Sequence, residues 1–355
     1  MRSAAKNAPL LACLLLWPAA CELMMEKTTA ALGDLDDTNS PIVAVWAHPS
    51  NSSVPECGGD CEFVKAAYVK WLESAGVRSL PIRFDSSPEE TKLIMDSVNG
   101  LLLPGGTPPV PDSARWALNY ATELNARGDF FPVWGTCVGW EWMAQALAGD
   151  YRAVTAGFDA ENFTQPLGIL PGAANSRMFS GFPAGLLDKA SSEPLTANAH
   201  TKGVTPEDFV ESGLDQVFRL LAVNEDRQGR AYVSAVEAFD IPMYGLQWHP
   251  EKSPFDWGLD PDGTPHHVIN HSADAVQLAQ VLSNFFASET RRNHHAFRVL
   301  KDWEDKMFHT REVTPTGPST GQRYIFHWER DEQRGTTVAS LRKSPRQLRG
   351  HTRSD

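Results

Sequence analysis

Residues 130–144 read FFPVWGTCVGWEWMA, and this stretch decides the fold class. The apolar run at 130–134 predicts a short buried strand, and 138–147 predicts a helix. Between them, glycines at positions −2 and +2 flank Cys137, which is the spacing of a nucleophile elbow that exposes the central side chain. The helix N-terminus behind the sulfur should lower the thiol pKa toward neutrality. We therefore expect an α/β fold with Cys137 as the nucleophile; a buried structural cysteine would not need both glycines.

Short apolar segments and amphipathic segments alternate on both sides of the elbow. Strands are predicted at 42–46, 79–82, 100–104, 217–223, 232–239 and 243–248. Helices are predicted at 62–76, 112–127 and 273–288, the second of them capped by Asp112 or Ser113. This alternation predicts a mostly parallel central sheet with helices on both faces, within one domain at 40–328. The three later strands either extend this sheet or add an antiparallel flap.

The two ends of the chain differ from this body. Residues 1–22 combine two early positive charges, a short apolar run and small residues near position 20, which predicts a secretory signal peptide; an N-terminal anchor is the alternative. Residues 329–355 are basic and poor in apolar side chains, so we expect a disordered tail, with a targeting or anion-binding role as the alternative. The signal peptide favours the secretory pathway, and hence a lysosome, a vacuole or the extracellular space.

Composition and charge exclude several classes of protein. The chain has 355 residues, 42% of them hydrophobic, and a net charge of −12, with +6 in residues 291–355 and −18 in the remainder. This is the composition of a globular protein. Its acidity argues against a nucleic-acid binder driven by bulk charge. Outside the N-terminus no apolar stretch approaches the length of a membrane span.

Secretion would permit two kinds of modification. Five cysteines are too few for a disulfide-built scaffold, although Cys57 and Cys61 in ECGGDC could form a local disulfide in an oxidising compartment. A metal pair at these cysteines is disfavoured because no second pair with matching spacing exists. Sequons at Asn51, Asn162 and Asn270 could carry N-glycans on surface loops.

Two further motifs supply chemical partners for Cys137. In YGLQWHPEKSPFDW, His249 follows a predicted strand and precedes Glu251 by two residues, so the carboxylate can fix the tautomer of the imidazole. The turn LLLPGG, which ends at Gly106, brings bare backbone to the end of another strand. The backbone N–H groups of Gly106 and Val138 could form an oxyanion hole. The set predicts acyl transfer by a cysteine with a histidine base, a reaction that needs no metal or cofactor.

In this order the three pieces resemble the class I glutamine amidotransferase-like family and, within it, the gamma-glutamyl hydrolases. The resemblance covers roughly 42–326 and depends mainly on PVWGTCVG and QWHPEKSP, with AAYVKWLESAGVRSLPIRFD, VNGLLLPGG and EPLTANAH as further matches. It implies a flavodoxin-like three-layer sandwich and suggests a homodimer. It also implies that the substrates are folylpoly-gamma-glutamates.

The resemblance assigns roles residue by residue. Cys137 would be the nucleophile that carries a gamma-glutamyl thioester, His249 its base and Glu251 the group that orients the base. The implied substrate contacts are Tyr68, Glu141 and His200. A glutaminase-type amidotransferase is the nearest alternative, disfavoured by the signal peptide and by the lack of a synthetase domain; a non-catalytic secreted folate-binding relative is the other. The loop after the first strand and the segment TKGVTPEDF depart from the family pattern.

The negative net charge of the protein conflicts with the negative charge of this substrate. A folylpoly-gamma-glutamate is a polyanion, and an acidic protein body would not attract it at neutral pH. Either a local basic patch offsets the repulsion, with Arg177, Lys202 and Lys252 as candidates, or the enzyme works in an acidic compartment where its carboxylates are partly protonated.

Overall fold

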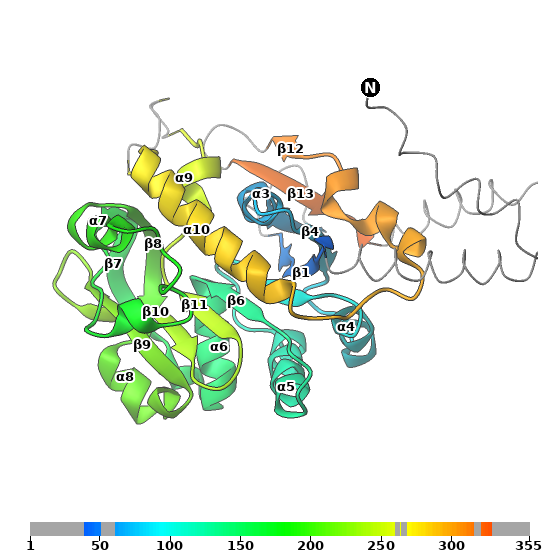
Figure 1. Ribbon diagram of the computed structural model, residues 1–355, viewed down its shortest axis with the longest axis horizontal. Helices are drawn as coiled ribbons and strands as arrows, with labels where there is room; N and C mark the ends of the chain where they lie inside the picture. The colour runs from blue at the N-terminus through cyan, green and yellow to red at the C-terminus, as the bar shows by residue number, and fades with distance from the viewer. Residues whose placement is uncertain (1–38, 51–60, 260–262, 264–267, 316–320, 329–355) are drawn as a thin grey trace, which may run out of the picture.

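The computed structural model describes residues 39–50, 61–259, 263, 268–315 and 321–328 (Figure 1). The predicted signal peptide, the basic tail at 329–355 and the sequon at Asn51 lie outside these residues. Cys61 is disulfide-bonded, and its predicted pairing with Cys57 stays a prediction because Cys57 also lies outside them. None of the described helices combines the length and the apolar character needed to cross a bilayer.

A seven-stranded sheet forms the centre of the fold. In spatial order its strands are β4 (Arg78–Ile82), β1 (Ile42–Trp46), β5 (Gly100–Leu103), β6 (Val133–Thr136), β11 (Met243–Leu246), β10 (Ala231–Ala238) and β9 (Phe218–Glu225). The first five run parallel, and β10 and β9 add antiparallel strands at one edge. The mostly parallel sheet confirms the expected fold class, and the later strands extend this sheet.

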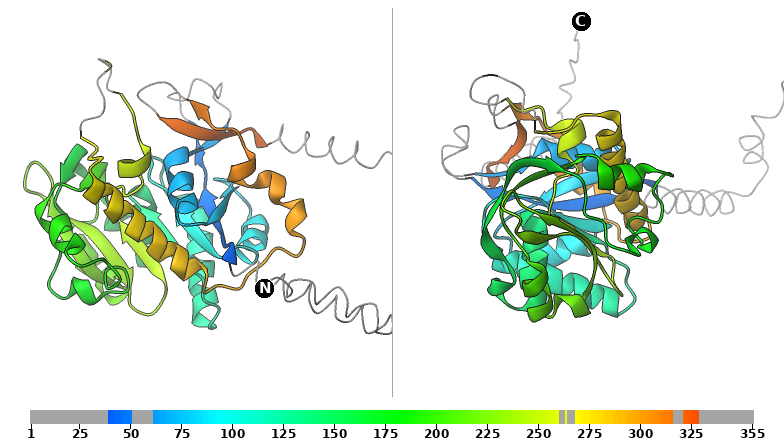
Figure 2. Two further views of the ribbon diagram at one scale, coloured as in Figure 1. Left: turned by 45° about the horizontal axis from the view of Figure 1, so that its top comes forward. Right: turned by 90° about the vertical axis from the view of Figure 1, so that its left-hand side faces the viewer.

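Helices cover both faces of the sheet, with α10 and α5 on opposite sides (Figures 1 and 2). One apolar core includes side chains of α4 (Pro88–Met95), α5 (Asp112–Ala126), α6 (Val138–Ala148) and α8 (Pro206–Glu211). The other includes side chains of α3 (Ala66–Glu73), α7 (Leu186–Ser192) and α10 (Ala273–Thr290). Along β1, alternate residues enter the two cores, with Ala44 and Trp46 in the first and Val43 and Val45 in the second. Burial on both faces explains why these strands read as continuous apolar runs.

Two smaller sheets and several short helices complete the described fold. One sheet contains β12 (Thr314–Pro315), β13 (Gln322–Phe326), β3 (Glu62–Lys65) and β2 (His48–Pro49), and the other contains β7 (Thr155–Gln165) and β8 (Thr196–Gly203). Helix α9 (Lys252–Phe255) follows β11. The 3-10 helices are η2 (Tyr151–Ala153), η3 (Ala173–Asn175), η4 (Leu214–Gln216), η5 (Leu300–Asp302), η6 (Glu304–Lys306) and η7 (Phe308–Thr310). The sequence did not reveal β7 and β8, whose residues show little apolar alternation.

The predicted helix at 62–76 is wrong at its start. Residues 62–65 form β3, which pairs antiparallel with β13 and β2, and the helix begins only at Ala66. Phe63 and Val64 fit the apolar stripe of a helix, but strand pairing with a segment about 260 positions away decides their conformation. This difference places Lys65 at the end of a strand.

Most other predicted bounds differ from the structure by one or two residues, and two further predictions about the ends of elements are wrong. The strand predicted from Phe130 begins at Val133, because the side chain of Asn125 bonds both the N–H and the C=O of Phe131 and Pro132 has no N–H to donate. Helix α5 is capped neither by Asp112 nor by Ser113, since its N-cap is Pro111 and no side chain bonds the first turn.

Candidate active site

Cys137 lies in a strained turn between β6 and α6. Its backbone has φ 53°, in the left-handed region that side chains other than glycine rarely adopt. The two neighbouring glycines are required by close packing. A Cβ on Gly139 would lie 2.0 Å from the carbonyl oxygen of Leu103, and one on Gly135 would lie 2.8 Å from the backbone of Gly139. The expected elbow is therefore present, but the cysteine is only 4% exposed, whereas the motif predicted an exposed side chain.

The parallel pairing of β6 with β11 brings His249 to this turn. The N–H of Cys137 donates to the carbonyl oxygen of Leu246 at 2.7 Å, three residues before His249. A Cβ on Gly105 would lie 2.7 Å from Cε1 of His249 and 3.1 Å from Cβ of Cys137. The imidazole and the cysteine thus approach the same glycine, and a side chain at that position would displace them.

Glu251 and Tyr68 both contact Nδ1 of His249. Oε1 of the Glu251 carboxylate is 2.8 Å from Nδ1, and the Tyr68 hydroxyl oxygen is 3.2 Å from it. The Tyr68 hydroxyl also accepts a hydrogen bond of 2.7 Å from the N–H of Gly105. Since the carboxylate accepts the Nδ1 proton, Nε2 is the basic nitrogen of the imidazole, and it has no hydrogen-bond partner among the described residues. This is the protonation state that a base needs.

The pKa values of the two groups indicate an uncharged pair in the free protein. Burial lowers the pKa of His249, although the Glu251 charge opposes the shift. Burial, followed by the charge of Glu141, raises the pKa of the Cys137 thiol, and the hydrogen bond from the N–H of Val138 offsets only part of this. The expectation of a lowered thiol pKa was therefore wrong, because desolvation outweighs the helix N-terminus. A thiol and an imidazole in this state would have to exchange the thiol proton for the sulfur to become a nucleophile.

Glu141 lies in the first turn of α6 and is also buried. Its Oε1 accepts a hydrogen bond of 3.0 Å from Nε2 of Gln247. Burial raises the pKa of this carboxyl group to about 7, against the lowering effects of the Gln247 hydrogen bond and the Lys202 charge. Below that pH the group is a neutral acid that can donate a hydrogen bond, close to the thiol whose pKa it influences.

His200 presents an imidazole nitrogen from β8 that no described residue bonds. Its Nδ1 donates to the carbonyl oxygen of Lys202 at 2.8 Å, and its buried Nε2 has no hydrogen-bond partner in the described part of the chain. Burial lowers the pKa of His200 to about 4, and the His249 charge adds to this lowering, which places the two rings near each other. Its ring packs on Tyr232 with centroids 4.7 Å apart. His200 is thus a neutral acceptor close to the base.

Sequence reasoning missed His48 and Gln247. The His48 ring lies against the predicted oxyanion turn, since a Cβ on Gly106 would be 3.0 Å from its Cε1, and its Nε2 is 3.4 Å from the carbonyl oxygen of Pro104. Burial lowers the pKa of His48 to about 4, so this ring is neutral. Gln247 lies two positions before His249 in QWHPEKSP, and its place directly after the buried strand β11 could have marked it as a buried polar residue. Nothing in the sequence around His48 gave an equivalent signal.

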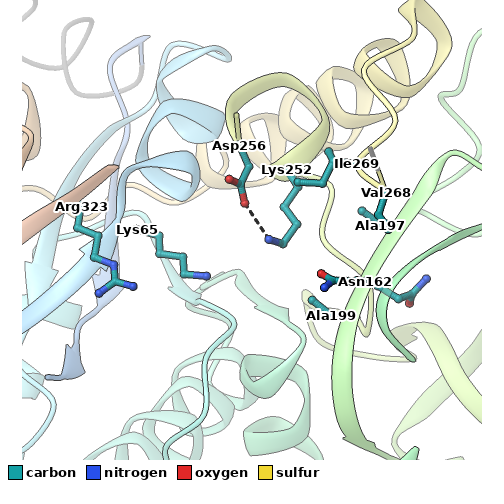
Figure 3. A pocket seen from close by; sticks show the side chains of 10 residues that line it. Lys65, Asn162, Ala197, Ala199, Lys252, Asp256, Val268, Ile269 and Arg323 are labelled. Atoms are coloured by element: carbon teal, nitrogen blue, oxygen red, sulfur yellow. Dashed lines mark hydrogen bonds and ion pairs between the residues drawn. The ribbon is translucent and has the colours of Figure 1, made fainter. Parts of the chain in front are cut away.

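The three predicted basic candidates lie in different surroundings in the structure. Arg177 bonds the carbonyl oxygens of Ala238 and Ile241 at the end of β10, so it belongs to the packing there. Lys202 is close enough for its charge to lower the pKa of Glu141. Lys252 forms an ion pair of 2.8 Å with Asp256 and lines a cavity beside the active site (Figure 3).

Two of the predicted sequons lie in the described part of the chain. Asn162 is exposed, and Asn270 donates to the carbonyl oxygen of Pro194 at 2.8 Å. Among the described residues, no group of three or more His, Cys, Asp or Glu side chains could hold a metal ion.

Comparison with known proteins gives one family and several relatives. Residues 41–251 match the family described as Peptidase C26. Gamma-glutamyl hydrolase B of Dictyostelium discoideum is 35% identical over 298 residues, which cover 81% of this chain and 84% of that protein. The gamma-glutamyl hydrolase of Homo sapiens is 34% identical over 299 residues (82% and 91%), and that of Mus musculus is 37% identical over 294 residues (81% and 89%). The glutaminase domain of Trypanosoma brucei CTPS has a TM-score of 0.41 at 15% identity, covering 66% of this chain and 94% of that one.

Proposed function

The chain belongs to the Peptidase C26 family, and we propose that it is a cysteine-type gamma-glutamyl hydrolase that cleaves the gamma-glutamyl isopeptide bonds of folylpoly-gamma-glutamates. One observation carries the assignment of its chemistry. Cys137 and the imidazole of His249 meet at Gly105, and Glu251 holds Nδ1 of that imidazole at 2.8 Å. A thiol and an oriented base at one point are the minimum for acyl transfer.

The first half of the reaction acylates the cysteine. The thiol proton of Cys137 passes to Nε2 of His249 as the sulfur attacks the side-chain carbonyl of a gamma-linked glutamate. The oxyanion accepts hydrogen bonds from the N–H groups of Gly106 and Val138, and Val138 already donates to the sulfur. The imidazolium then gives its proton to the leaving amine, the amide bond breaks, and a gamma-glutamyl thioester remains.

Water completes the cycle. His249 takes a proton from a water molecule that attacks the thioester carbonyl, and it returns that proton to the departing sulfur. Glu251 stabilises the imidazolium in both halves of the reaction, and Tyr68 fixes Gly105 next to the ring. Because both the thiol and the imidazole begin uncharged in a buried site, no ion has to be desolvated before the attack.

Glu141 and His200 are proposed to contact the substrate. A protonated Glu141 can donate a hydrogen bond to the alpha-carboxylate of the glutamate that is attacked, whereas its ionised form would repel that group. The neutral His200 can accept a hydrogen bond at Nε2. A carboxyl pKa of about 7 next to an anionic substrate favours work in an acidic compartment. Of the proposed locations, it therefore supports a lysosome or a vacuole, whereas the extracellular space is proposed from the predicted signal peptide alone. A homodimer is proposed from the family alone.

The test uses a defined substrate and mass spectrometry. The purified protein is incubated with pteroyl-pentaglutamate, and we expect release of glutamate or short poly-gamma-glutamate. Free glutamine serves as the rival substrate, since its preferred hydrolysis would indicate a glutaminase-type enzyme. Binding of the pentaglutamate without any cleavage would indicate a non-catalytic relative instead.

A further inference from the structure

A cavity of about 200 Å³ beside the active site is lined by more positive than negative side chains. Its lining includes three cationic side chains and one carboxylate: Lys65, Lys252, Arg323 and Asp256. Lys65 ends β3, Arg323 lies on β13 and Lys252 begins α9, so three elements from distant parts of the sequence deliver these charges. The amino groups of Lys65 and Lys252 point into the same space, with Asn162 across from them (Figure 3).

Of the three cationic side chains in this cavity, Lys65 is the one whose charged form is destabilised by its surroundings. The carboxylate of Asp256 pairs with Lys252 at 2.8 Å. Lys65 stands directly opposite Arg323 in the pairing of β3 with β13, a placement of like charges that destabilises a sheet. The nearby Lys252 charge and then burial lower the pKa of Lys65 to about 8, against the raising effects of Asp256 and Glu251. Lys65 is therefore still protonated at neutral pH, although the charges of Lys252 and Arg323 destabilise its protonated form.

The cavity adjoins the reacting sulfur. Ala199 lines the cavity, and its carbonyl oxygen is 4.0 Å from Sγ of Cys137. The charge of Lys65 is close enough to lower the pKa of the thiol, and the charge of Cys137 raises the pKa of Lys252. The cavity is therefore close enough to the sulfur for one substrate chain to occupy both.

We propose that this cavity is a subsite for an alpha-carboxylate of the poly-gamma-glutamyl chain, and that Lys65 and Arg323 are specificity-determining residues. The inference rests on the proposed function. Each gamma-linked glutamate keeps one free alpha-carboxylate, so the substrate presents a regular series of anions along its backbone. A carboxylate in the cavity compensates the charge of Lys65, and it fixes which bond of the series reaches the sulfur.

The experiment is a mutant cycle between protein and substrate. Chains of gamma-linked glutamate are made with single alpha-carboxylates replaced by carboxamides, and kcat/KM is measured for wild type, Lys65→Gln, Lys65→Arg and Arg323→Gln. In wild type we expect one carboxamide analogue to lose about 10- to 100-fold in kcat/KM, as for a lost charged hydrogen bond. Lys65→Gln should lose a similar factor with the parent chain and no further factor with that analogue. Lys65→Arg should retain most of the activity.

Two controls separate specificity from folding. Lys189→Gln removes an equal charge from an exposed ion pair with Asp274 and should leave kcat/KM unchanged. Thermal unfolding of Lys65→Gln should occur at the wild-type temperature or higher, since the substitution relieves repulsion among Lys65, Lys252 and Arg323. A residue with only a structural role would lower that temperature instead.

The possible failures are distinguishable. If wild type cleaves the parent chain and every carboxamide analogue equally well, the cavity is not a carboxylate subsite, and the proposed function stands. If Lys65→Gln loses equal factors with the parent chain and with all analogues, the inference is also overturned. If wild type cleaves no gamma-glutamyl bond, the proposed function fails and this inference fails with it.

Discussion

The carboxylate of Glu251 lies 2.8 Å from Nδ1 of His249, and both side chains are buried although only Pro250 separates them in the sequence. The short loop brings the carboxylate to the ring, and Tyr68 and the hydrogen bond from the N–H of His249 to the carbonyl oxygen of Ala197 hold the residue from other parts of the chain. Burial lowers the pKa of the imidazole and the carboxylate opposes that change, so the base stays neutral at rest and is stabilised when it takes the thiol proton.

Removal of the carboxylate charge should slow catalysis. Glu251→Gln keeps an acceptor near Nδ1 but loses the charge that stabilises the imidazolium, so kcat should fall by about 10²- to 10⁴-fold. The control is Tyr68→Phe, which removes only the hydroxyl at 3.2 Å and should cost about 10-fold. Steady-state kinetics on a gamma-glutamyl chain measures both, and an unchanged kcat in Glu251→Gln would contradict the assigned role.

Cys137→Ala should abolish turnover without loss of the fold. The side chain is small and the strained φ of 53° remains, so the unfolding temperature should stay near that of wild type. Mass spectrometry should then show no thioester and no product, while calorimetry should still detect binding of the substrate chain. Residual cleavage above the background rate would remove Cys137 as the nucleophile.

Substitutions at two glycines should have different effects. A Cβ on Gly105 would meet the Tyr68 hydroxyl at 2.6 Å and Cε1 of His249 at 2.7 Å, so Gly105→Ala should displace the imidazole and lower kcat by about 10²-fold. A Cβ on Gly139 would meet the backbone oxygen of Leu103 at 2.0 Å, so Gly139→Ala should fail to fold or unfold at much lower temperature. Circular dichroism and kinetics on the pair distinguish the two outcomes; equal stability losses would argue against this packing.

The pH profile of KM should show a rise near pH 7 that depends on Glu141. Its pKa is raised to about 7, so the neutral acid predominates below that pH and the carboxylate above it. If the neutral form binds the substrate carboxylate, KM should rise as the pH increases through 7, and Glu141→Gln should remove that rise. A KM limb that persists in Glu141→Gln would assign it to another group.

The same carboxyl group links stability to pH. Because its folded-state pKa lies above that of the unfolded chain, the folded protein binds the proton more tightly. The contribution is fully present below the unfolded pKa and is lost as the pH rises through the folded value near 7. Denaturant titrations of wild type and Glu141→Gln should therefore diverge over this window, and parallel curves would contradict the pKa shift.

Local motifs predicted much of the candidate site, because the chemistry of a nucleophile elbow depends on neighbours in the chain. Two flanking glycines identify Cys137, and a two-residue spacing identifies His249 with Glu251. The parallel sheet followed from strand and helix alternation for the same reason. In each case neighbouring residues in the sequence decide the local structure.

Features that depend on distant pairing or on burial could not be read in this way. Phe63 and Val64 fit a helix but pair with β13. The thiol pKa rises because the folded protein surrounds Cys137, and no motif reports that burial. Lys65 and Arg323 meet only because β3 pairs with β13. The sequence therefore gave Lys252 of this cavity but not these two, and it also gave Arg177, which packs at the end of β10 instead.

The pairing of β3 with β13 joins the beginning and the end of the described fold. During translation Lys65 therefore has no partner strand until residues 322–326 have been synthesised, so a nascent chain can bring Cys137 and His249 together before the proposed subsite is complete. A chain that ended after residue 315 would still contain β6, which leads into Cys137, and its partner β11. It would lack β13 and with it Arg323, which lines the cavity.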